Sequence, residues 1–209
     1  MPNTNIQVAQ TLGAAQGPGT FPVMAAGKQG DAVFSEYAGR YYLGSYNKSR
    51  YSGANQAAVT TSAAFATAYT GLMLYNPSGS GVNCILEKFG LAEVVAQTAA
   101  LAFGIMTGIN TGTAVSGVTA DGQKSKFVGQ NNGAGLIYKA ATLPTAPTLD
   151  TVLGSLGTGA VTVDTVDGFI FDLGGDIILP PGAYACLYTS AASVASSLIA
   201  SFQWMELPQ

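Results

Sequence analysis

The sequence predicts an all-β protein, a jelly-roll-like antiparallel β-sandwich that carries an extended N-terminal arm. Short apolar runs alternate along the chain with turn signals rich in Gly, Pro, Asn and Ser, which is the spacing of short strands and not of helices. Residues 1–33 hold five glycines and three prolines and show neither helical nor strand periodicity, so they are expected to form the arm. The rest of the chain, 34–209, suffices for one domain.

The expected strands follow one another closely along this domain. The clearest hairpin is expected within residues 71–90, where two apolar runs flank the turn 76–81 and its glycines permit positive φ. Three short strands are expected within residues 168–190, separated by two glycines and by a Pro-Pro-Gly segment. The other expected strands are Arg40–Tyr46, Gln56–Ser62, Leu91–Val95, Ala99–Thr107, Leu136–Lys139, Ala160–Val163 and Ser197–Pro208.

Three segments of the domain differ from the regular pattern of short strands. A helix over Ala92–Met106 is the main alternative to strands there, because alanine favours helices, but Gly104 and Gly108 weaken it. The run that holds the only tryptophan, Trp204, is expected to be docked in a sheet. Residues 140–159 are rich in Pro, Thr and Gly and are expected to form a long connecting loop, a kind of loop that often carries function.

The composition indicates that other protein chains cover part of the surface. Only 9% of the residues are charged, while 48% are hydrophobic and the mean hydropathy is +0.30. A typical soluble domain carries about 25% charged residues. The most apolar window, 89–107, is broken by Glu93, Gln97 and two glycines, so no membrane partner is predicted. The net charge of −3 argues against a nucleic-acid partner. The N-terminal residues show no secretory signal, and synthesis in a host cytoplasm is expected.

Catalytic motifs are missing from the sequence. Without histidine, neither a Ser-His-Asp triad nor the usual Cys/His zinc site is possible within this chain, and no phosphate- or dinucleotide-binding glycine motif occurs. Cys84 and Cys186 lie in apolar runs and are expected to be small buried hydrophobes. We therefore predict no enzyme activity, no cofactor and no metal. Four aspartates are interpreted as turn carboxylates, with a calcium site or a catalytic pair as alternatives: Asp164, Asp167, Asp172 and Asp176.

An aromatic and basic stretch is the candidate partner-binding site. Tyrosine and arginine are enriched where proteins meet, and tyrosine also forms sugar-binding platforms. The alternatives are a strand pair with half-buried tyrosines, or a site for a glycan or another ligand. The candidate residues are Tyr37, Arg40, Tyr41, Tyr42, Tyr46, Arg50 and Tyr51.

Parts of the chain resemble the cement, or head decoration, proteins of tailed bacteriophages. The resemblance rests on AAVTTSAAFATAYTGLMLYNPSGSGVNCILEKFG, on DIILPPGAYACLYTSAA and on SFQWMELP, and it covers residues 56–107 and 168–208. It implies a jelly-roll-like domain, usually trimeric, that sits on the capsid exterior and ties major capsid subunits together. It implies no catalytic residues.

The resulting expectation is a structural virion protein that decorates and stabilises a bacteriophage capsid. Its partners would be the major capsid protein and further copies of itself, and its location would be the capsid exterior. The alternative is a receptor- or glycan-binding head or fibre module of a phage virion. Low charge predicts self-association, and the resemblance makes the expected assembly a homotrimer. Because their apolar residues occupy both strand faces, Ala99–Met106 or Ser197–Trp204 are expected near its axis.

Overall fold

The computed structural model describes residues 40–110, 112–157 and 168–209. The chain divides into two compact units, 1–42 and 43–209, and the fold described here is that of the second. The expected arm, 1–33, and the expected strand Ala160–Val163 lie outside the described residues. Among the described residues, no helix is long and apolar enough to span a membrane.

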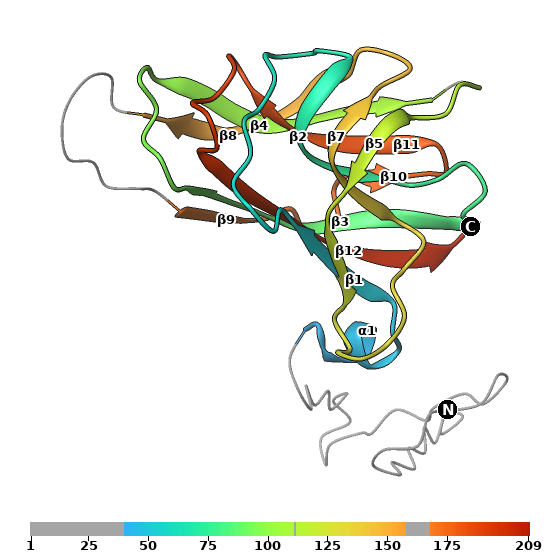
Figure 1. Ribbon diagram of the computed structural model, residues 1–209. Helices are drawn as coiled ribbons and strands as arrows, with labels where there is room; N and C mark the ends of the chain where they lie inside the picture. The colour runs from blue at the N-terminus through green and yellow to red at the C-terminus, as the bar shows by residue number, and fades with distance from the viewer. Residues whose placement is uncertain (1–39, 111, 158–167) are drawn as a thin grey trace, which may run out of the picture. The chain divides into compact units, whose positions relative to one another are not determined.

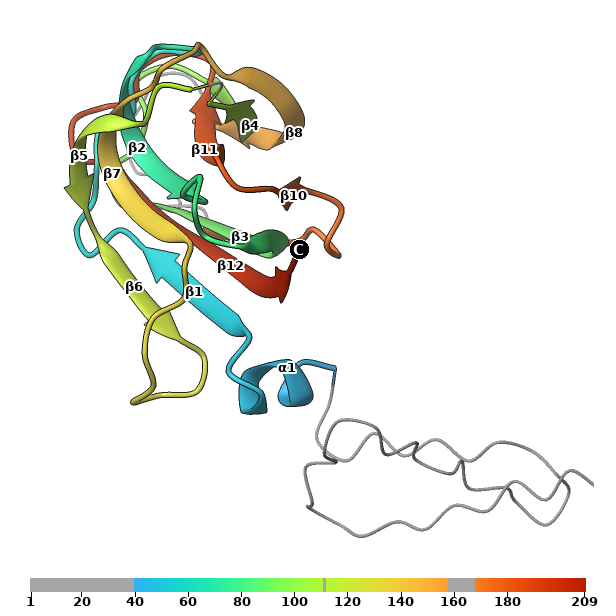
Figure 2. The ribbon, with the colours of Figure 1, turned by 90° about the vertical axis from the view of Figure 1, so that its right-hand side faces the viewer.

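Two antiparallel sheets pack face to face as a sandwich, which confirms the predicted fold class (Figures 1 and 2). In the first sheet the order is β10–β3–β12–β1–β6, and β9 also pairs with β3. The strands of this sheet are β1 (Arg50–Ala54), β3 (Val82–Glu93), β6 (Gly122–Ser125), β9 (Gly168–Asp172), β10 (Ile178–Leu179) and β12 (Leu198–Pro208). The jelly-roll connectivity remains a prediction.

The second sheet has the order β5–β7–β2–β11–β4–β8. Its central strands, β2, β11 and β4, are apolar on both faces, whereas the outer strands β5 and β8 are largely exposed. The strands of this sheet are β2 (Ala68–Tyr75), β4 (Leu101–Ile109), β5 (Ser116–Ala120), β7 (Leu136–Thr142), β8 (Thr148–Leu156) and β11 (Ala183–Thr189).

The main core fills the space between the sheets. Trp204, Phe202 and Phe89 of the first sheet have no exposed surface, and neither has Phe103 of the second. The rings of Phe89 and Phe202 lie 5.2 Å apart, a favourable tilted contact. Burying these large apolar side chains supplies most of the free energy that holds the sheets together, at roughly 1.5–3 kcal/mol for each aliphatic or phenyl side chain.

A second apolar cluster covers the outer face of the second sheet. Alternate residues of β11 pack in different clusters: Ala185 belongs to the main core, and its neighbours Tyr184 and Cys186 belong to the outer cluster. Met106 of β4 also lies in the outer cluster and is 1% exposed. The part of the expected run Ala99–Met106 that lies in β4, from Leu101 to Met106, is therefore covered on both faces by its own chain, and its apolar pattern requires no neighbouring subunit.

The strand β12 lies at the centre of the first sheet and pairs with β3 and β1. Its inward residues Leu198, Ala200, Phe202 and Trp204 are at most 1% exposed, so the expectation that Trp204 is docked in a sheet is confirmed. Two residues beyond Trp204 along the strand, the carboxylate of Glu206 accepts hydrogen bonds from Ala134 N, Gly135 N and Trp204 Nε1, each 2.9 Å long.

Several predicted elements are confirmed. The strands within 168–190 appear as β9, β10 and β11, and the runs beginning near Ala99 and Leu136 appear as β4 and β7. The alternative helix over Ala92–Met106 is wrong. Both cysteines are buried and free of disulfides, as expected.

Other predictions are wrong for identifiable reasons. The two runs within 71–90 form β2 and β3, which belong to different sheets, so the turn 76–81 crosses between the layers and forms no hairpin. The expected loop 140–159 contains the end of β7 and the whole of β8, because an edge strand with both faces near solvent shows no apolar alternation. The expected strand Gln56–Ser62 makes one isolated bridge, from Val59 to Leu198.

Candidate functional site

The expected strand Arg40–Tyr46 is instead a short helix, α1 (Tyr42–Tyr46). Asn47 N donates to Leu43 O (2.8 Å), and Lys48 adopts a positive φ of 59°, a left-handed conformation that commonly ends helices. Five residues are too few for a helix that is stable alone. The helix therefore depends on packing against the first sheet.

That packing occurs at Gly44, where the helix backbone meets the outer face of the first sheet. A Cβ atom on Gly44 would lie 2.8 Å from Cδ of Arg50 and 3.4 Å from Cε of Met205. Glycine suits this point because a Cβ atom would require either the helix or the side chain of Arg50, which its ion pair with Glu87 holds, to shift.

Arg50, one of the predicted partner-binding residues, lies in a buried ion pair. Its Nε donates to Glu87 Oε2 (2.5 Å), and Nη2 also lies against that oxygen. The register shifts between Gln203 and Trp204, so that they oppose Lys88 and Leu86 and leave Glu87 as the extra residue of a β-bulge. Arg50 is 4% exposed, and the prediction that it belongs to the binding surface is wrong.

The partly buried side chain of Tyr51 packs against the main core. Its ring centroid lies 6.0 Å from that of Trp204, and its hydroxyl donates to Lys48 O (2.5 Å). Burial, followed by the negative charge of Glu206, raises the pKa of this tyrosine. Because successive residues of β1 point to opposite faces of the sheet, Tyr51 faces the main core and Arg50 lies on the outer face, covered by α1.

The helix itself carries the exposed part of the predicted site. Tyr42 is 40% exposed, Leu43 68% and Tyr46 49%. The guanidinium of Arg40 lies 5.2 Å from the ring centroid of Tyr41, within cation–π range. The predicted residue Tyr37 lies outside the described residues. We call Tyr42, Leu43 and Tyr46 the α1 surface.

The turn after β6 adds apolar surface that sequence reasoning missed. Phe127 is 37% and Val128 86% exposed, and the Phe127 ring lies 6.3 Å from that of Tyr46. The signal in the sequence is an apolar pair inside the polar segment KSKFVGQNNG. We call residues 126–130 the β6 turn.

Positive charge gathers around this turn on the outer face of the first sheet. The pKa of Lys126 is lowered, first by burial and then by the nearby charges of Arg50, Lys124 and Lys88, while Glu87 opposes the shift. Those four cations are half of the chain's eight basic residues. An acidic protein thus concentrates its positive charge at one place.

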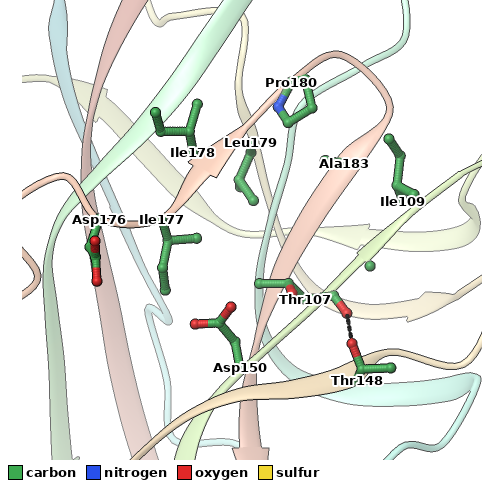
Figure 3. A pocket seen from close by; sticks show the side chains of 11 residues that line it. Thr107, Ile109, Thr148, Asp150, Asp176, Ile177, Ile178, Leu179, Pro180 and Ala183 are labelled. Atoms are coloured by element: carbon green, nitrogen blue, oxygen red, sulfur yellow. Dashed lines mark hydrogen bonds between the residues drawn. The ribbon is translucent and has the colours of Figure 1, made fainter.

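A groove of about 540 Å³ lies elsewhere in the domain, between β4 and β8 on one side and the segment 176–180 on the other. Asp150 reaches from β8 towards the segment that carries Asp176 and Ile177 (Figure 3). Thr107 and Thr148 also line the groove, and Thr148 Oγ1 donates to Thr107 O (3.5 Å). We call this the acidic groove.

Of the four aspartates interpreted as turn carboxylates, the structure describes Asp172 and Asp176. Asp172 acts as a turn carboxylate, since its Oδ1 accepts a hydrogen bond from Gly174 N (2.9 Å). Asp176 lines the acidic groove, while Asp164 and Asp167 lie outside the described residues. Within the described ranges no three His, Cys, Asp or Glu residues are placed to hold a metal ion.

Comparison with known proteins gives no relative for this chain. No family model, curated protein or solved structure matches it.

Proposed function

We propose that the protein is a structural subunit of a bacteriophage virion, which decorates and stabilises the capsid by binding the major capsid protein. One observation carries the proposal: aromatic and aliphatic side chains stand exposed on the α1 surface of a chain with 9% charged residues. Such side chains favour contact with another protein. The resemblance of the sequence to capsid cement proteins supplies the kind of partner.

Binding energy alone is sufficient for this role. Covering an exposed leucine or tyrosine contributes on the order of 1–2 kcal/mol, and aromatic anchors at the centre of an interface contribute about 2 kcal/mol or more. The backbone of α1 is fixed on β1 and β12 through Gly44, so the helix presents its side chains at little conformational cost on binding. We propose that copies of the chain act together as a homotrimer on the capsid exterior.

The test is sedimentation of the purified protein with expanded empty capsids built from the major capsid protein of the same virus. The wild-type chain should saturate a fixed number of sites. Tyr42→Ala and Tyr46→Ala should each weaken binding about tenfold or more, which corresponds to about 1.4 kcal/mol. Phe65→Ala is the matched control, because Phe65 is 42% exposed and packs on Tyr188 of the other sheet. Equal binding by all three variants contradicts the proposal.

The acidic groove favours one other function, a receptor- or glycan-binding module of the virion. Its carboxylates and hydroxyls are groups that hydrogen-bond sugars, and its volume falls in the range of small-ligand sites. A glycan binder would attach to host cells, lose that attachment in Asp150→Asn, and ignore capsids. A capsid-decorating protein would bind capsids, would keep that binding in Asp150→Asn, and would not attach to host cells.

A further inference from the structure

The β6 turn forms a narrow apolar projection with lysines beside it. Phe127 N donates to Ser125 Oγ (3.1 Å) and Gln130 N donates to Phe127 O (3.1 Å), and Gly129 has the positive φ of 88° that a tight turn needs. These bonds hold Val128 at the tip, where 86% of its surface is exposed. Lys124 is exposed and Lys126 half-buried.

The acidic groove has the complementary chemistry. Its apolar lining includes Ile177 and Leu179, with Ile109 (49% exposed) and Ile178 (55% exposed) also among its residues. Asp150 and Asp176 supply negative charge, and no lysine or arginine lines the groove among the described residues. A binding partner with an apolar tip and flanking cations fits both properties.

The two features lie at opposite ends of the domain. In the first sheet, β6 occupies one end of the strand order and β10 the other. Figure 2 shows the loop after β6 at the lower left of the domain, whereas β8 and β10 lie above it on the right. One molecule therefore cannot insert its own turn into its own groove.

We propose that the β6 turn of one copy inserts into the acidic groove of a second copy. Val128 and Phe127 contact the isoleucines there, and Lys124 and Lys126 face Asp150 and Asp176. The contact joins two different surfaces, and contacts of this kind close into rings when the rotation between copies permits. This inference rests on the self-association included in the proposed function and names the surfaces that produce it.

Charge complementarity within the chain is what favours a second copy as the occupant. The protein has a net charge of −3, yet four of its eight basic residues gather at the base of the turn: Lys126 and, near it, Lys124, Lys88 and Arg50, of which Arg50 is paired with Glu87. Opposite charges on two surfaces of one chain guide identical copies into a head-to-tail arrangement and disfavour head-to-head pairing. The isoleucines of the groove would lose water in the same contact, which adds an apolar contribution.

Light scattering coupled to gel filtration, over a range of micromolar concentrations, tests the contact by charge reversal. Lys124→Glu/Lys126→Glu and Asp150→Lys/Asp176→Lys should each raise the dissociation constant at least about tenfold. The chain that combines all four reversals should recover the wild-type association, because a Glu-bearing turn then meets a Lys-bearing groove. Lys139→Glu, on β7, is the control that changes charge elsewhere and should leave association unchanged.

Val128→Glu keeps the test valid if a lysine variant folds poorly. The side chain is 86% exposed, so the substitution should leave the fold intact, and it should weaken association by placing a carboxylate beside Asp150 and Asp176. Far-ultraviolet circular dichroism and Trp204 fluorescence check the fold of every variant. Raising the salt concentration should also weaken the association of the wild-type chain, because the Debye length falls from about 10 Å at 0.1 M to about 3 Å at 1 M.

Each outcome decides between the two proposals. Unchanged association in the charge-reversed variants and Val128→Glu, or failure of the fourfold variant to recover, overturns the head-to-tail contact and leaves capsid binding intact. Association that is lost on deletion of residues 1–30 but not on charge reversal assigns the self-association to the arm and also overturns the head-to-tail contact. Association that follows the charges, in a protein that ignores capsids, supports the contact and contradicts the capsid role.

Discussion

The Arg50–Glu87 ion pair should affect stability mainly through the penalty for breaking it. We predict that Arg50→Met costs about 3 kcal/mol of unfolding free energy and Glu87→Leu about 5 kcal/mol, the range for removing one partner of a buried pair. The two charges are 4% and 7% exposed, respectively. Loss of Arg50 leaves Glu87 beside Lys126, which compensates in part. Loss of Glu87 leaves Arg50 beside Lys126, a like charge, which is why the second cost is larger.

The double variant Arg50→Met/Glu87→Leu should cost about 1 kcal/mol or less, because two apolar side chains then replace two desolvated charges. The strong non-additivity is the signature of the pair in a double-mutant cycle. Lys124→Met is the matched control: it removes an exposed cation from the neighbouring strand and should change stability by no more than about 0.5 kcal/mol.

Urea unfolding followed by Trp204 fluorescence measures these differences, because Trp204 is the only tryptophan and has no exposed surface in the folded domain. The reasoning is refuted if Glu87→Leu costs no more than Lys124→Met, or if the double variant loses as much stability as the two single variants together.

Three further predictions concern the cysteines, a core glycine and the arm. Burial and then Glu206 raise the pKa of Cys84 from 9.0 to about 12, so its thiolate fraction at pH 8 is about a thousandfold below that of an unfolded chain; a thiol reagent should label neither cysteine until urea unfolds the protein. Because the folded pKa is the higher one, this thiol lowers stability only as the pH rises above 9.0, which thermal melts at pH 8 and pH 10 compare. Gly53→Ala places a Cβ 2.1 Å from Cγ1 of Ile137 and should cost about 1–3 kcal/mol in urea unfolding, whereas Gly79→Ala, with no atom within 4 Å, should cost far less; equal costs would contradict the packing. Deleting residues 1–30 should leave thermal unfolding nearly unchanged while weakening capsid attachment, and a large loss of stability would show that these residues belong to the core.

The sequence predicts strands well where burial imposes a pattern. The run that forms β12 is expected as a docked strand, and its burial alternates in the structure, while Pro180-Pro181-Gly182 marks the start of β11. The sequence predicts less well which strands pair with one another. Asn76 and Pro77 indicate that the chain turns, but the same residues suit a turn within one sheet and a crossing between two. Sheet assignment depends on non-local pairing, which a local pattern does not encode.

The candidate site was only partly predictable for a related reason. Tyrosines near a strand are equally suited to a core, to a helix surface and to an interface. Whether Tyr51 points inward depends on its pairing with Trp204, and whether Arg50 is buried depends on a bulge at Glu87, far along the chain. The acidic groove combines Asp150 of β8 with Asp176 beyond β9, and no spacing in the sequence indicates that these strands approach each other.

The central place of β12 in the first sheet has a consequence for biosynthesis. This strand separates β1 from β3, although it follows every other described strand along the chain. While the ribosome is still making the residues before 198, the nascent sheet lacks its middle, and β1 and β3 both present unpaired backbone groups. Such edges recruit other chains. Folding of the sandwich must therefore wait for residues 198–208, and a cell that makes many copies at once must keep these incomplete chains apart.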